Sequence, residues 1–534
     1  MLRLTQIKLS IHDDLSAIQQ QVLKRLRIQP SDLLELRIYK ESIDARKAGD
    51  IYFIYTVDVG VKDETKFLTG KIKHLAPTPD LAYQAPKLKH GTQPLTHRPV
   101  VIGFGPAGMY AALLLAQQGY RPLVLERGEA VDDRVRSIEA FWQQGQLNPN
   151  SNVQFGEGGA GTFSDGKLTS RGKDLRGRQV LAELVKAGAP EEILYQAHPH
   201  VGTDLLRDIV KRIRQEIIAL GGEVRFQAQV KQFKSVSGRL QAVVLTSGEL
   251  IETEQAILAI GHSARDTFSE LDAAGVEMTA KPFAVGVRIE HPQTVIDQAQ
   301  YKTFAGHARL GAAEYRLTYK ASNGRGVYTF CMCPGGLVVP SSSEAGHLVT
   351  NGMSEHARDQ KNANSGLLVQ VFPEDFGSAG ALAGIDFQRA LEQKAFALGG
   401  GTYQAPAQLV GDFLKGQPST AMGSVTPSYA LGVVPTDLTR LFPDYITAAL
   451  KEALIGLDHK LHGFAMADAV LTAVESRSSS PLRINRDQTS LQSVSVKGLY
   501  PSGEGAGFAG GIVSAAIDGL KCAESLISAF APMV

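Results

Sequence analysis

The sequence predicts an α/β fold that is divided into more than one domain. The chain has 534 residues, and a single core rarely grows past a few hundred. Its 54 glycines stand largely in short clusters, which indicate close backbone approach rather than flexible linkers. Residues 99–128 read as strand, glycine turn, helix and strand, the pattern of a βαβ unit. We therefore expect an α/β protein organised around this unit.

The first 95 residues predict a small α/β domain that ends in a linker. Residues 3–11 alternate as a strand does, and residues 14–28 have helical spacing with Asp14 as a plausible N-cap. Residues 33–43 and 50–61 read as two more strands. Residues 75–99 are rich in proline and have no periodicity, which is typical of a linker.

The rest of the chain predicts two further domains. Residues 202–222 form an amphipathic pattern that ends on glycine, and residues 223–261 read as strands joined by hairpin turns. From about Lys281 the pattern is irregular and strand-rich, with helical stretches near 386–398 and 443–474. We expect a dinucleotide-binding domain over 96–280 and 481–534, interrupted by an α+β substrate domain over 281–480.

Composition and charge exclude several classes of protein. The formal net charge is +1, so bulk electrostatics give no reason to expect a nucleic-acid partner. No apolar run approaches the roughly 18 residues of a membrane span, and the N-terminus lacks the apolar core of a secretory signal. Three cysteines argue against a disulfide framework. The "HPH" at 198–200 has no third metal ligand at useful spacing. We expect a cytoplasmic protein without a metal site.

The turn "GFGPAG" fits the G-x-G-x-x-G fingerprint. Gly103 permits the sharp turn, Gly105 lets a pyrophosphate approach the backbone, and Gly108 lets the helix pack on the sheet. Glu126 ends the second strand at the spacing of a ribose-hydroxyl acceptor. Pro106, Ala107 and Arg127 complete this first set of candidate contacts.

A second glycine-rich block spans residues 152–171. It nearly spells a P-loop, but Leu168 stands where Ser or Thr should hold magnesium, and no strand leads into it. We interpret the block as a second loop against the same cofactor, with a surface loop as the alternative. Its candidate contacts are backbone N–H groups of Gly158, Gly159 and Gly161 and the side chains of Thr162, Ser164 and Lys167.

Four segments together resemble a known family. They are "VIGFGPAG…VLERG", "GEGGAGT", "AILAIGHSA" and "GLYPSGEGAGFAGGI", in the order found in FAD-dependent oxidoreductases of the glutathione-reductase type. More narrowly, "KESIDARK", "FCMCPGG", "VTNGMS" and "VESRSSSPLRI" resemble bacterial FAD-dependent dehydrogenases with an appended N-terminal domain. The resemblance implies a Rossmann-like FAD-binding domain and FAD as the cofactor.

The resemblance also implies that the C-terminal glycines fold back onto the βαβ unit. Gly503 and Glu504 would then lie on the ribityl or pyrophosphate side of FAD. Gly510, Gly511 and Ile512 would open a helix toward the pyrimidine edge of the flavin, where a helix N-terminus stabilises negative charge. Gly261 would lie near the cofactor, and Val230, read as the end of a strand, would contact the adenine.

Two groups of residues are candidates for contact with a substrate. Cys331 and Cys333 are two apart, so on a strand they would share a face and could both point at the flavin; two buried structural cysteines are the alternative. Arg477 and Arg483 suit a carboxylate or phosphate, or else pair internally with Glu475. Arg288 and Glu290 alternate on a strand, as expected of a solvated face or a structural pair.

These observations favour an FAD-dependent oxidoreductase that acts on a small molecule between the FAD and substrate domains. No second G-x-G-x-x-G unit is present for a nicotinamide. Two alternatives stay open. One is a flavoprotein whose N-terminal domain binds a macromolecule, for RNA modification or sensing. The other is a thiol–disulfide reductase that uses Cys331 and Cys333.

Overall fold

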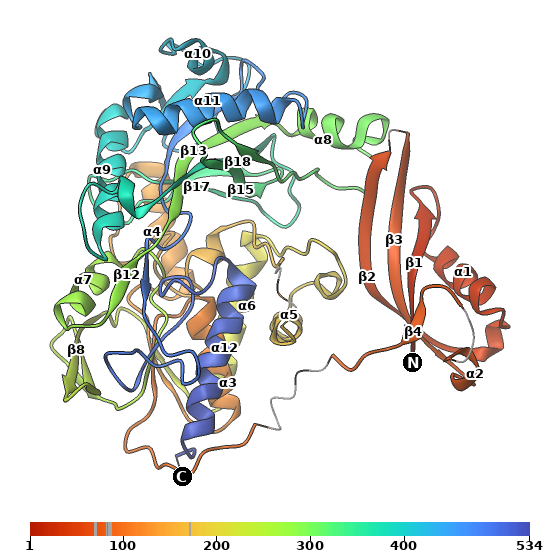
Figure 1. The fold of residues 1–534 in the computed structure, drawn as a ribbon, viewed down its shortest axis with the longest axis horizontal. Helices are drawn as coiled ribbons and strands as arrows, with labels where there is room; N and C mark the ends of the chain where they lie inside the picture. The colour runs from red at the N-terminus through yellow and green to blue at the C-terminus, as the bar shows by residue number, and fades with distance from the viewer. Residues whose placement is uncertain are drawn as a thin grey trace.

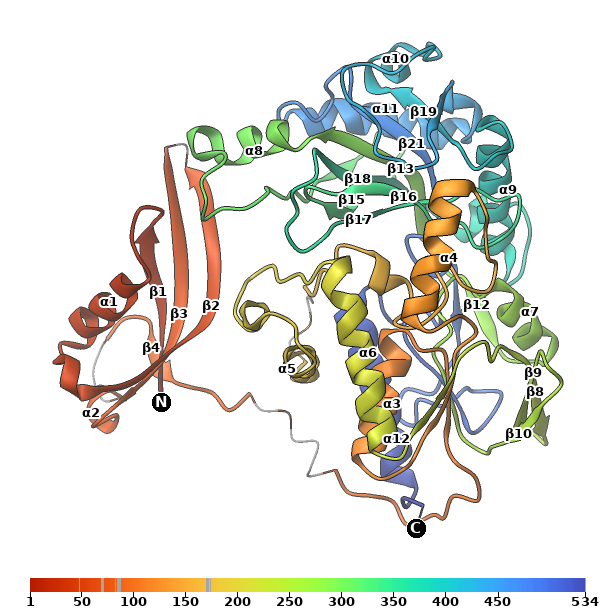
Figure 2. The same cartoon turned by 180° about the vertical axis from the view of Figure 1, so that it is seen from behind.

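The computed structural model describes residues 1–47, 49–68, 72–81, 83, 88–169, 172 and 174–533 (Figure 1). The first 77 residues form a separate sheet that stands beside the rest of the molecule in both ribbon views (Figures 1 and 2). The other described residues form a larger body built on two sheets, one parallel and one mostly antiparallel.

The N-terminal region is an antiparallel sheet of order β2-β3-β1-β4 with a helix against it. Leu4, Ile18 and Val57 belong to its buried core, which explains the alternating pattern of the sequence. The expected cap at Asp14 is wrong, because helix α1 begins at Ser16 with Leu15 as N-cap and no side-chain cap. Its elements are β1 (Leu2–Ser10), α1 (Ser16–Leu26), β2 (Leu33–Lys47), β3 (Asp50–Val61), α2 (Thr65–Leu68) and β4 (Leu75–Pro77).

The centre of the body is a parallel sheet of order β23-β11-β5-β6-β7. Alternate residues of its strands face opposite sides: Val101 packs with the layer that contains helices α3, α6 and α12, and Val100 packs with the layer that contains β8–β10 and α7. The strands are β5 (Val100–Ile102), β6 (Leu123–Leu125), β7 (Glu223–Arg225), β11 (Ala256–Leu258) and β23 (Leu499–Pro501). The expected βαβ unit and Rossmann-type α/β fold are confirmed.

Helices and a small antiparallel sheet cover the parallel sheet. Helices α3 and α12 lie side by side in both views (Figures 1 and 2). The helices are α3 (Pro106–Gln117), α4 (Val131–Gln144), α5 (Arg176–Lys186), α6 (Thr203–Ala219), α7 (Arg265–Ala273) and α12 (Ile512–Ala529). The small sheet consists of β8 (Val230–Val236), β9 (Arg239–Leu245) and β10 (Leu250–Glu252).

The second large sheet has the order β14-β15-β18-β13-β21-β19-β20. The helix expected over 443–474 ends at Asp458, and the buried strand β21 follows it. The strands are β13 (Phe283–Pro292), β14 (Thr318–Lys320), β15 (Gly326–Cys333), β18 (Asn362–Val371), β19 (Ala405–Leu409), β20 (Val433–Pro435) and β21 (Val470–Glu475). The helices around it are α8 (Gln293–Tyr301), α9 (Ala383–Leu398), α10 (Val410–Lys415) and α11 (Asp444–Asp458).

Two short strand pairs complete the body. Strands β12 (Met278–Ala280) and β22 (Leu482–Ile484) pair where the chain passes between the parallel sheet and the seven-stranded sheet. Strands β16 (Leu337–Pro340) and β17 (Thr350–Met353) form a hairpin. In the described part of the chain, no helix has both the length and the apolar character that crossing a membrane requires.

Candidate functional site

One cavity of about 1570 Å³ is lined by the N-terminal region, the parallel-sheet region and the seven-stranded sheet. It brings together glycine segments that lie almost four hundred positions apart in the sequence. The predicted residues on its wall are Gly103, Gly105, Pro106, Ala107, Glu126, Arg127, Gly159, Gly161, Ser164, Lys167, Val230, Gly261, Cys331, Arg477, Gly503, Glu504, Gly510, Gly511 and Ile512. The predicted residues that do not line it are Gly108, Gly158, Thr162, Cys333 and Arg483.

The first glycine turn is shaped by close backbone contacts. Gly103 has φ +95°, and a Cβ there would lie 2.4 Å from the Ala259 carbonyl oxygen. A Cβ on Gly108 would lie 1.9 Å from the Gly103 carbonyl oxygen, so only glycine lets α3 pack this closely. A Cβ on Gly105 would meet only the Gly159 Cα, at 3.7 Å, and the Gly105 N–H has no acceptor among the described residues. The start of α3 therefore offers room and free donors to a phosphate.

Glu126 accepts hydrogen bonds from the backbone of three loops near the end of β6. Its Oε2 accepts a hydrogen bond from the Phe104 N–H at 2.8 Å, and its Oε1 accepts from Gly128 at 2.9 Å and Gly156 at 3.0 Å. A carboxylate has about four acceptor positions, so it retains capacity for a ribose hydroxyl. Arg127, beside it, forms a bidentate ion pair with Asp266 at 3.0 and 2.7 Å.

The second glycine block is organised by a residue that the sequence analysis did not single out. Arg134, fully buried on α4, donates to the carbonyl oxygens of Asn152, Glu157 and Val153 at 2.9, 2.6 and 3.0 Å. Burial lowers the pKa of Arg134 to about 10. These bonds hold the loop so that Gly159 and Gly161 reach the cavity. No local pattern marks an arginine for this role, because its three acceptors lie on a later loop.

Two contacts predicted from this block are wrong. Thr162 is buried beneath the loop, where its backbone carbonyl accepts from the Thr203 hydroxyl at 2.8 Å. The Gly158 N–H donates to the Phe104 carbonyl oxygen at 2.8 Å, so it is not free to bind a cofactor. The 3₁₀ turn that starts at Ala160 directs these residues away from the cavity. Ser164 and Lys167 do line it.

The C-terminal glycines meet the first turn and the second block. The Gly503 N–H donates to Asp518 at 2.8 Å, and a Cβ on Gly503 would lie 2.8 Å from the Ala107 Cβ. A Cβ on Gly161 would lie 3.0 Å from the Ile512 side chain, at the start of α12. The Gly511 N–H has no acceptor among the described residues. A second helix N-terminus is therefore directed at the same cavity as α3.

Glu504 lies on the cavity wall, and none of the described residues forms a hydrogen bond with its carboxyl group. Burial raises the pKa of Glu504 to about 7, although Lys281 acts in the opposite direction. Gly261 and His262, which follow β11 in the sequence, also line the cavity. Burial, with Arg477 and Arg265, lowers the pKa of His262 to about 3, so this imidazole is neutral at physiological pH.

Val230 lines the cavity, but the predicted strand around it is wrong. Strand β7 ends at Arg225 and β8 begins at Val230, so Val230 opens a strand rather than closing one. The intervening residue Gln227 has φ +53°, which breaks the extended run. Ala228, Gln229 and Val230 together form the cavity wall there.

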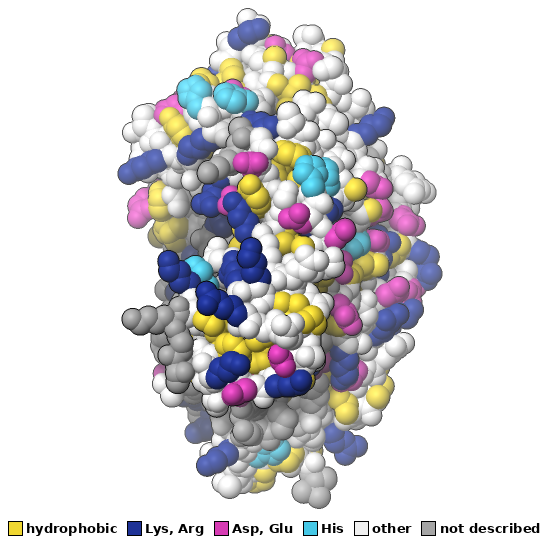
Figure 3. Space-filling view, turned by 90° about the vertical axis from the view of Figure 1, so that its right-hand side faces the viewer, with side chains coloured by type: hydrophobic (Ala, Val, Ile, Leu, Met, Phe, Trp, Pro, Cys, Tyr) yellow, Lys and Arg dark blue, Asp and Glu magenta, His cyan; other side chains and the backbone are white. Residues whose placement is uncertain are grey.

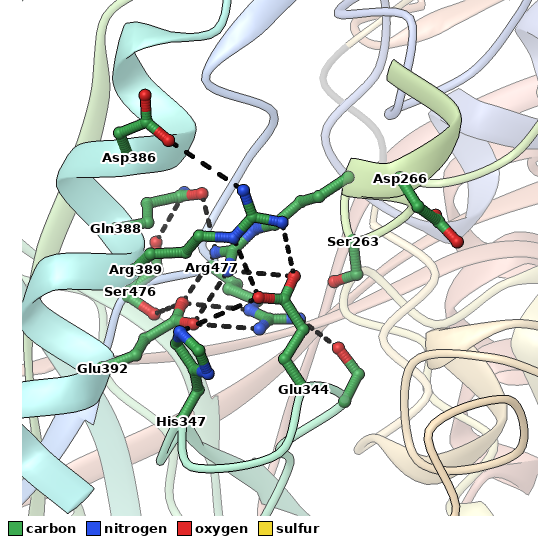
Figure 4. Close-up of polar contacts among 12 residues, drawn as sticks. Ser263, Asp266, Glu344, His347, Asp386, Gln388, Arg389, Glu392, Ser476 and Arg477 are labelled. Atoms are coloured by element: carbon green, nitrogen blue, oxygen red, sulfur yellow. Dashed lines mark hydrogen bonds and ion pairs between the residues drawn. The ribbon is translucent and has the colours of Figure 1, made fainter. Parts of the chain in front are cut away.

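The prediction that Arg477 binds a substrate anion is not supported by its surroundings. Arg477 donates to both carboxylate oxygens of Glu392, at 3.1 and 3.0 Å (Figure 4). Arg265 donates to the same two oxygens at 2.7 and 2.9 Å. Burial alone would raise the pKa of Glu392, but the two guanidinium groups hold it well below its usual value. Arg477 therefore forms an internal ion pair, but its partner is Glu392 and not Glu475, which the sequence had suggested.

Arg483 is exposed on β22, and its guanidinium donates to the Gly507 carbonyl oxygen at 3.4 Å. It lies outside the cavity because the alternation of β22 buries Leu482 and Ile484 and turns Arg483 outward. Arg486 is occupied by a bidentate ion pair with Asp518 at 2.9 and 2.7 Å. The prediction of an anion site on Arg483 is therefore wrong.

The two thiols do not share the cavity wall. A β-bulge lies between Phe330 and Cys333, and Cys331 has φ +43°. The spacing rule for a regular strand fails at a bulge, so Cys331 lines the cavity while Cys333 is fully buried behind it. The Cys333 thiol donates to the Cys331 carbonyl oxygen at 3.3 Å, and both cysteines are free.

Arg288 and Glu290 are fully buried, so the solvated face considered for them is wrong. The face of β13 that carries them is covered by other parts of the chain: Arg288 donates to Asn351 of β17 at 3.0 Å, and Glu290 accepts from the Ser428 hydroxyl at 2.6 Å. Arg288 forms a bidentate ion pair with Glu475, with the Nη2–Oε1 bond at 2.8 Å, and donates to the Cys331 carbonyl oxygen at 2.8 Å. This ion pair fixes the backbone of the bulge that presents Cys331.

Comparison with known proteins finds family matches over two parts of the chain and a relative over nearly its whole length. The family described as "FAD-dependent protein, C-terminal domain-like" matches residues 282–478, and a domain of unknown function matches residues 1–60. An uncharacterized protein of Clostridium beijerinckii is 52% identical over 530 residues, which cover 99% of either chain.

Solved structures show weaker similarity. Glycine oxidase from Bacillus cereus is 11% identical, with 81% of this chain and 95% of that chain covered and a TM-score of 0.31. CtdE in complex with FAD is 10% identical, with 80% and 83% covered and a TM-score of 0.30. Similarities this low identify neither a substrate nor a reaction.

The lining of the cavity is itself suited to FAD. It has two helix N-termini with free backbone donors, glycines where side chains would intrude, and a carboxylate at the end of β6 for a ribose. These are the features that an adenine dinucleotide requires. The chain therefore belongs to the family of the Clostridium beijerinckii protein, carries a C-terminal domain of the FAD-dependent type, and uses FAD as its cofactor.

Proposed function

We propose that this protein is a cytoplasmic FAD-dependent oxidoreductase of the glutathione-reductase type that acts on a small molecule. Its FAD-binding domain comprises residues 96–280 and 481–534, and residues 281–480 supply the opposite wall of the substrate site. One observation carries the proposal: a single cavity is lined both by the glycine segments and by β15 of the seven-stranded sheet. A substrate held against β15 would therefore lie beside the cofactor.

Bound FAD supplies the redox chemistry by accepting or donating two electrons, while the protein supplies binding and electrostatics. The start of α3 would hold the pyrophosphate, and Glu126 would accept from the ribose. The N-terminus of α12 would favour negative charge on the flavin ring, because its free N–H groups carry partial positive charge. Residues Gly103–Ala107, Gly159–Gly161 and Gly510–Ile512 would form this cradle.

Two side chains on the wall are suited to proton transfer. Glu504 has its pKa raised by burial to about 7, close to the pH at which an acid–base group works best. Cys331 lies on the substrate side, where the neighbouring Cys333 thiol and the Arg288 guanidinium lower its pKa. We assign Glu504 the exchange of a proton with the substrate. Because only one sulfur faces the cavity, we do not assign a disulfide exchange to the cysteine pair.

The test is an anaerobic titration of the purified yellow protein with NADH and NADPH, followed by candidate organic reductants. We expect stoichiometric FAD in the native protein and bleaching of its visible absorption by an electron donor. Bleaching by a nicotinamide would direct the search toward an oxidant, whereas bleaching by an organic donor alone would identify a dehydrogenase. A folded protein that retains no FAD would contradict the proposal.

A further inference from the structure

We infer that the N-terminal region forms one wall of the substrate chamber and that this chamber takes an amphipathic anion, an apolar or aromatic small molecule with a carboxylate. The inference rests on the proposed function and extends it to a substrate class. It also gives the first 77 residues a role in the reaction.

The size of the cavity is the first argument. Ligand pockets typically have roughly 300–1,000 Å³, whereas this cavity has about 1570 Å³. It extends beyond the glycine segments to β15, to the loop after α8 and to the N-terminal sheet. The N-terminal residues on its wall are Glu41, Ser42, Ile43, Ala45 and Phe53, from β2 and β3. The space beyond the cofactor therefore has the N-terminal sheet as a boundary.

The N-terminal sheet is fixed to this position by contacts on two sides. The Arg309 guanidinium donates to the carbonyl oxygens of Ile11 and Asp13 at 3.0 and 2.6 Å and lies 4.1 Å from the centre of the Phe53 ring. Leu310 packs into the N-terminal core. On the other side, Glu41 accepts from the Ala197 N–H at 2.8 Å and donates its own N–H to the Tyr195 carbonyl at 2.7 Å. These contacts hold the N-terminal sheet against the chamber.

The wall of this outer part is rich in aromatic and aliphatic side chains. They come from all three sides of the chamber, and several carry a hydroxyl group at the end of an apolar ring. They are Ile43, Phe53, Tyr301, Leu310, Tyr319 and Tyr328. Such a surface favours an apolar or aromatic body over a sugar or a phosphate ester.

Positive charge exceeds negative charge on the same wall. Asp165 pairs with Lys167 at 3.0 Å and Arg358 at 2.6 Å, and Glu314 lies 3.9 Å from Lys167, so this cluster is neutral. The excess of positive charge comes from Arg309 and Arg316, which face the single carboxylate of Glu41 on the rest of this wall. The Arg309 hydrogen bonds go to carbonyl and phenol oxygens rather than to a carboxylate. Arg316 is exposed on the wall and forms no hydrogen bond or ion pair with the described residues. An arginine fork in this state suits a carboxylate.

The outer face of the N-terminal side has a different character. Figure 3 shows that basic, acidic and hydrophobic side chains are mixed there, with one group of Lys and Arg side chains among them. The face turned toward the cavity, with Ile43 and Phe53, is the part with a consistent chemistry. We therefore place the specific function of this region at its inner face.

The experiment uses two acids, 2-naphthoate and octanoate, and their neutral counterparts, 2-naphthylmethanol and octanol. Binding to the purified full-length holoprotein is measured by calorimetry, and the flavin absorption is recorded in the same samples. Ile43→Glu, at a wall position 42% exposed, is compared with Leu34→Glu, which changes a 65% exposed leucine of the same strand outside the cavity. Arg316→Gln is compared with Lys320→Gln, an exposed cation on nearby β14 outside the cavity.

We expect the acids to bind at least tenfold more tightly than the alcohols and to perturb the flavin spectrum. Arg316→Gln should raise the Kd of the acids about tenfold and leave the alcohols unchanged, since it removes one charge-assisted hydrogen bond. Ile43→Glu should raise the Kd of both acids at least tenfold, while both control variants match the wild type. Equal binding of acids and alcohols, or wild-type affinity in Ile43→Glu and Arg316→Gln, would overturn the inference. Calorimetry does not depend on the flavin, so a protein without FAD would refute the proposed function separately.

Discussion

At the scale of single residues, Glu504 is a carboxyl group in the cofactor cavity without a hydrogen-bond partner among the described residues. Its pKa is raised by burial to about 7, whereas a glutamate in an unfolded chain has a pKa of about 4.3. Between these values the folded protein binds more protons than the unfolded chain does. The stabilising contribution of the protonated group is therefore complete below about pH 4.3 and is lost as the pH rises through about 7.

We expect Glu504→Gln to remove this contribution to the pH dependence. The thermal midpoint of the wild type should fall more steeply from pH 5 to pH 8 than that of the variant, because glutamine stays neutral throughout. The measurement is thermal unfolding across this range at constant flavin content. Glu355→Gln, at an exposed position, is the control and should keep the wild-type slope. Parallel slopes for wild type and Glu504→Gln would contradict the assignment.

Arg134 supports the second glycine block through three buried carbonyl oxygens. Arg134→Met should cost about 3 kcal/mol or more in the free energy of unfolding, because these acceptors would lose their donor inside the protein. It should also lower the FAD content, since Gly159 and Gly161 depend on that loop. Urea denaturation and flavin absorbance check both effects. Arg136→Met, on the solvent side of the same helix, should change neither.

At the scale of elements, the start of α3 separates two roles of glycine. Gly105 has an ordinary φ and space beyond its Cβ, whereas a Cβ on Gly108 would collide with the Gly103 carbonyl oxygen. Gly105→Val should therefore leave the apoprotein folded and raise the Kd for FAD more than tenfold, because the side chain would occupy the phosphate position. Gly108→Val should prevent folding. Circular dichroism and flavin titration distinguish the two, and a loss of structure in Gly105→Val would refute this division.

The elements predicted correctly from the sequence are those that a local residue pattern determines. The unit from β5 through α3 to β6 was predictable because strand, turn glycines and helix follow one another without interruption. The burial of Cys333 behind the cavity wall was not predictable, because a bulge changes the alternation of β15 and the spacing of residues gives no sign of it. The strand predicted to end at Val230 was wrong because of a second local irregularity. A positive φ at Gln227 interrupts the extended chain, so β8 begins at Val230.

At the scale of the whole molecule, the unpredicted contacts join distant segments. The partner of Arg477 is Glu392 on α9, and the partner of Arg288 is Glu475 on β21. A buried arginine needs buried hydrogen-bond acceptors, but the sequence contains many carboxylates and carbonyl groups and the fold selects among them. The same applies to Arg134, whose role depends on a loop that packs across it. For this reason, the arginines of the segment 475–486 did not identify a substrate-binding site, although their residue type suits an anion.

The cavity wall comes from both ends of the chain and from its middle, which predicts coupled loss of cofactor and structure. On heating, release of FAD and loss of secondary structure should occur at the same temperature. Flavin fluorescence, which rises on release, and far-ultraviolet circular dichroism measure the two events. Release of flavin well below the loss of structure would show that the cavity opens while the sheets stay intact.

The order of the parallel sheet, with β23 beside β11 and β11 beside β5, has a consequence for synthesis. The N-terminal region leaves the ribosome first, but the cofactor cavity lacks a wall until the segment from Gly503 to Ile512 has been made. At typical translation rates this delay is on the order of 20–80 s. During that time the glycine turn at the start of α3 is exposed without its partner. We therefore expect FAD to bind only after the start of α12 has been made, and a chain that stops before β23 to retain FAD less tightly than the whole chain does.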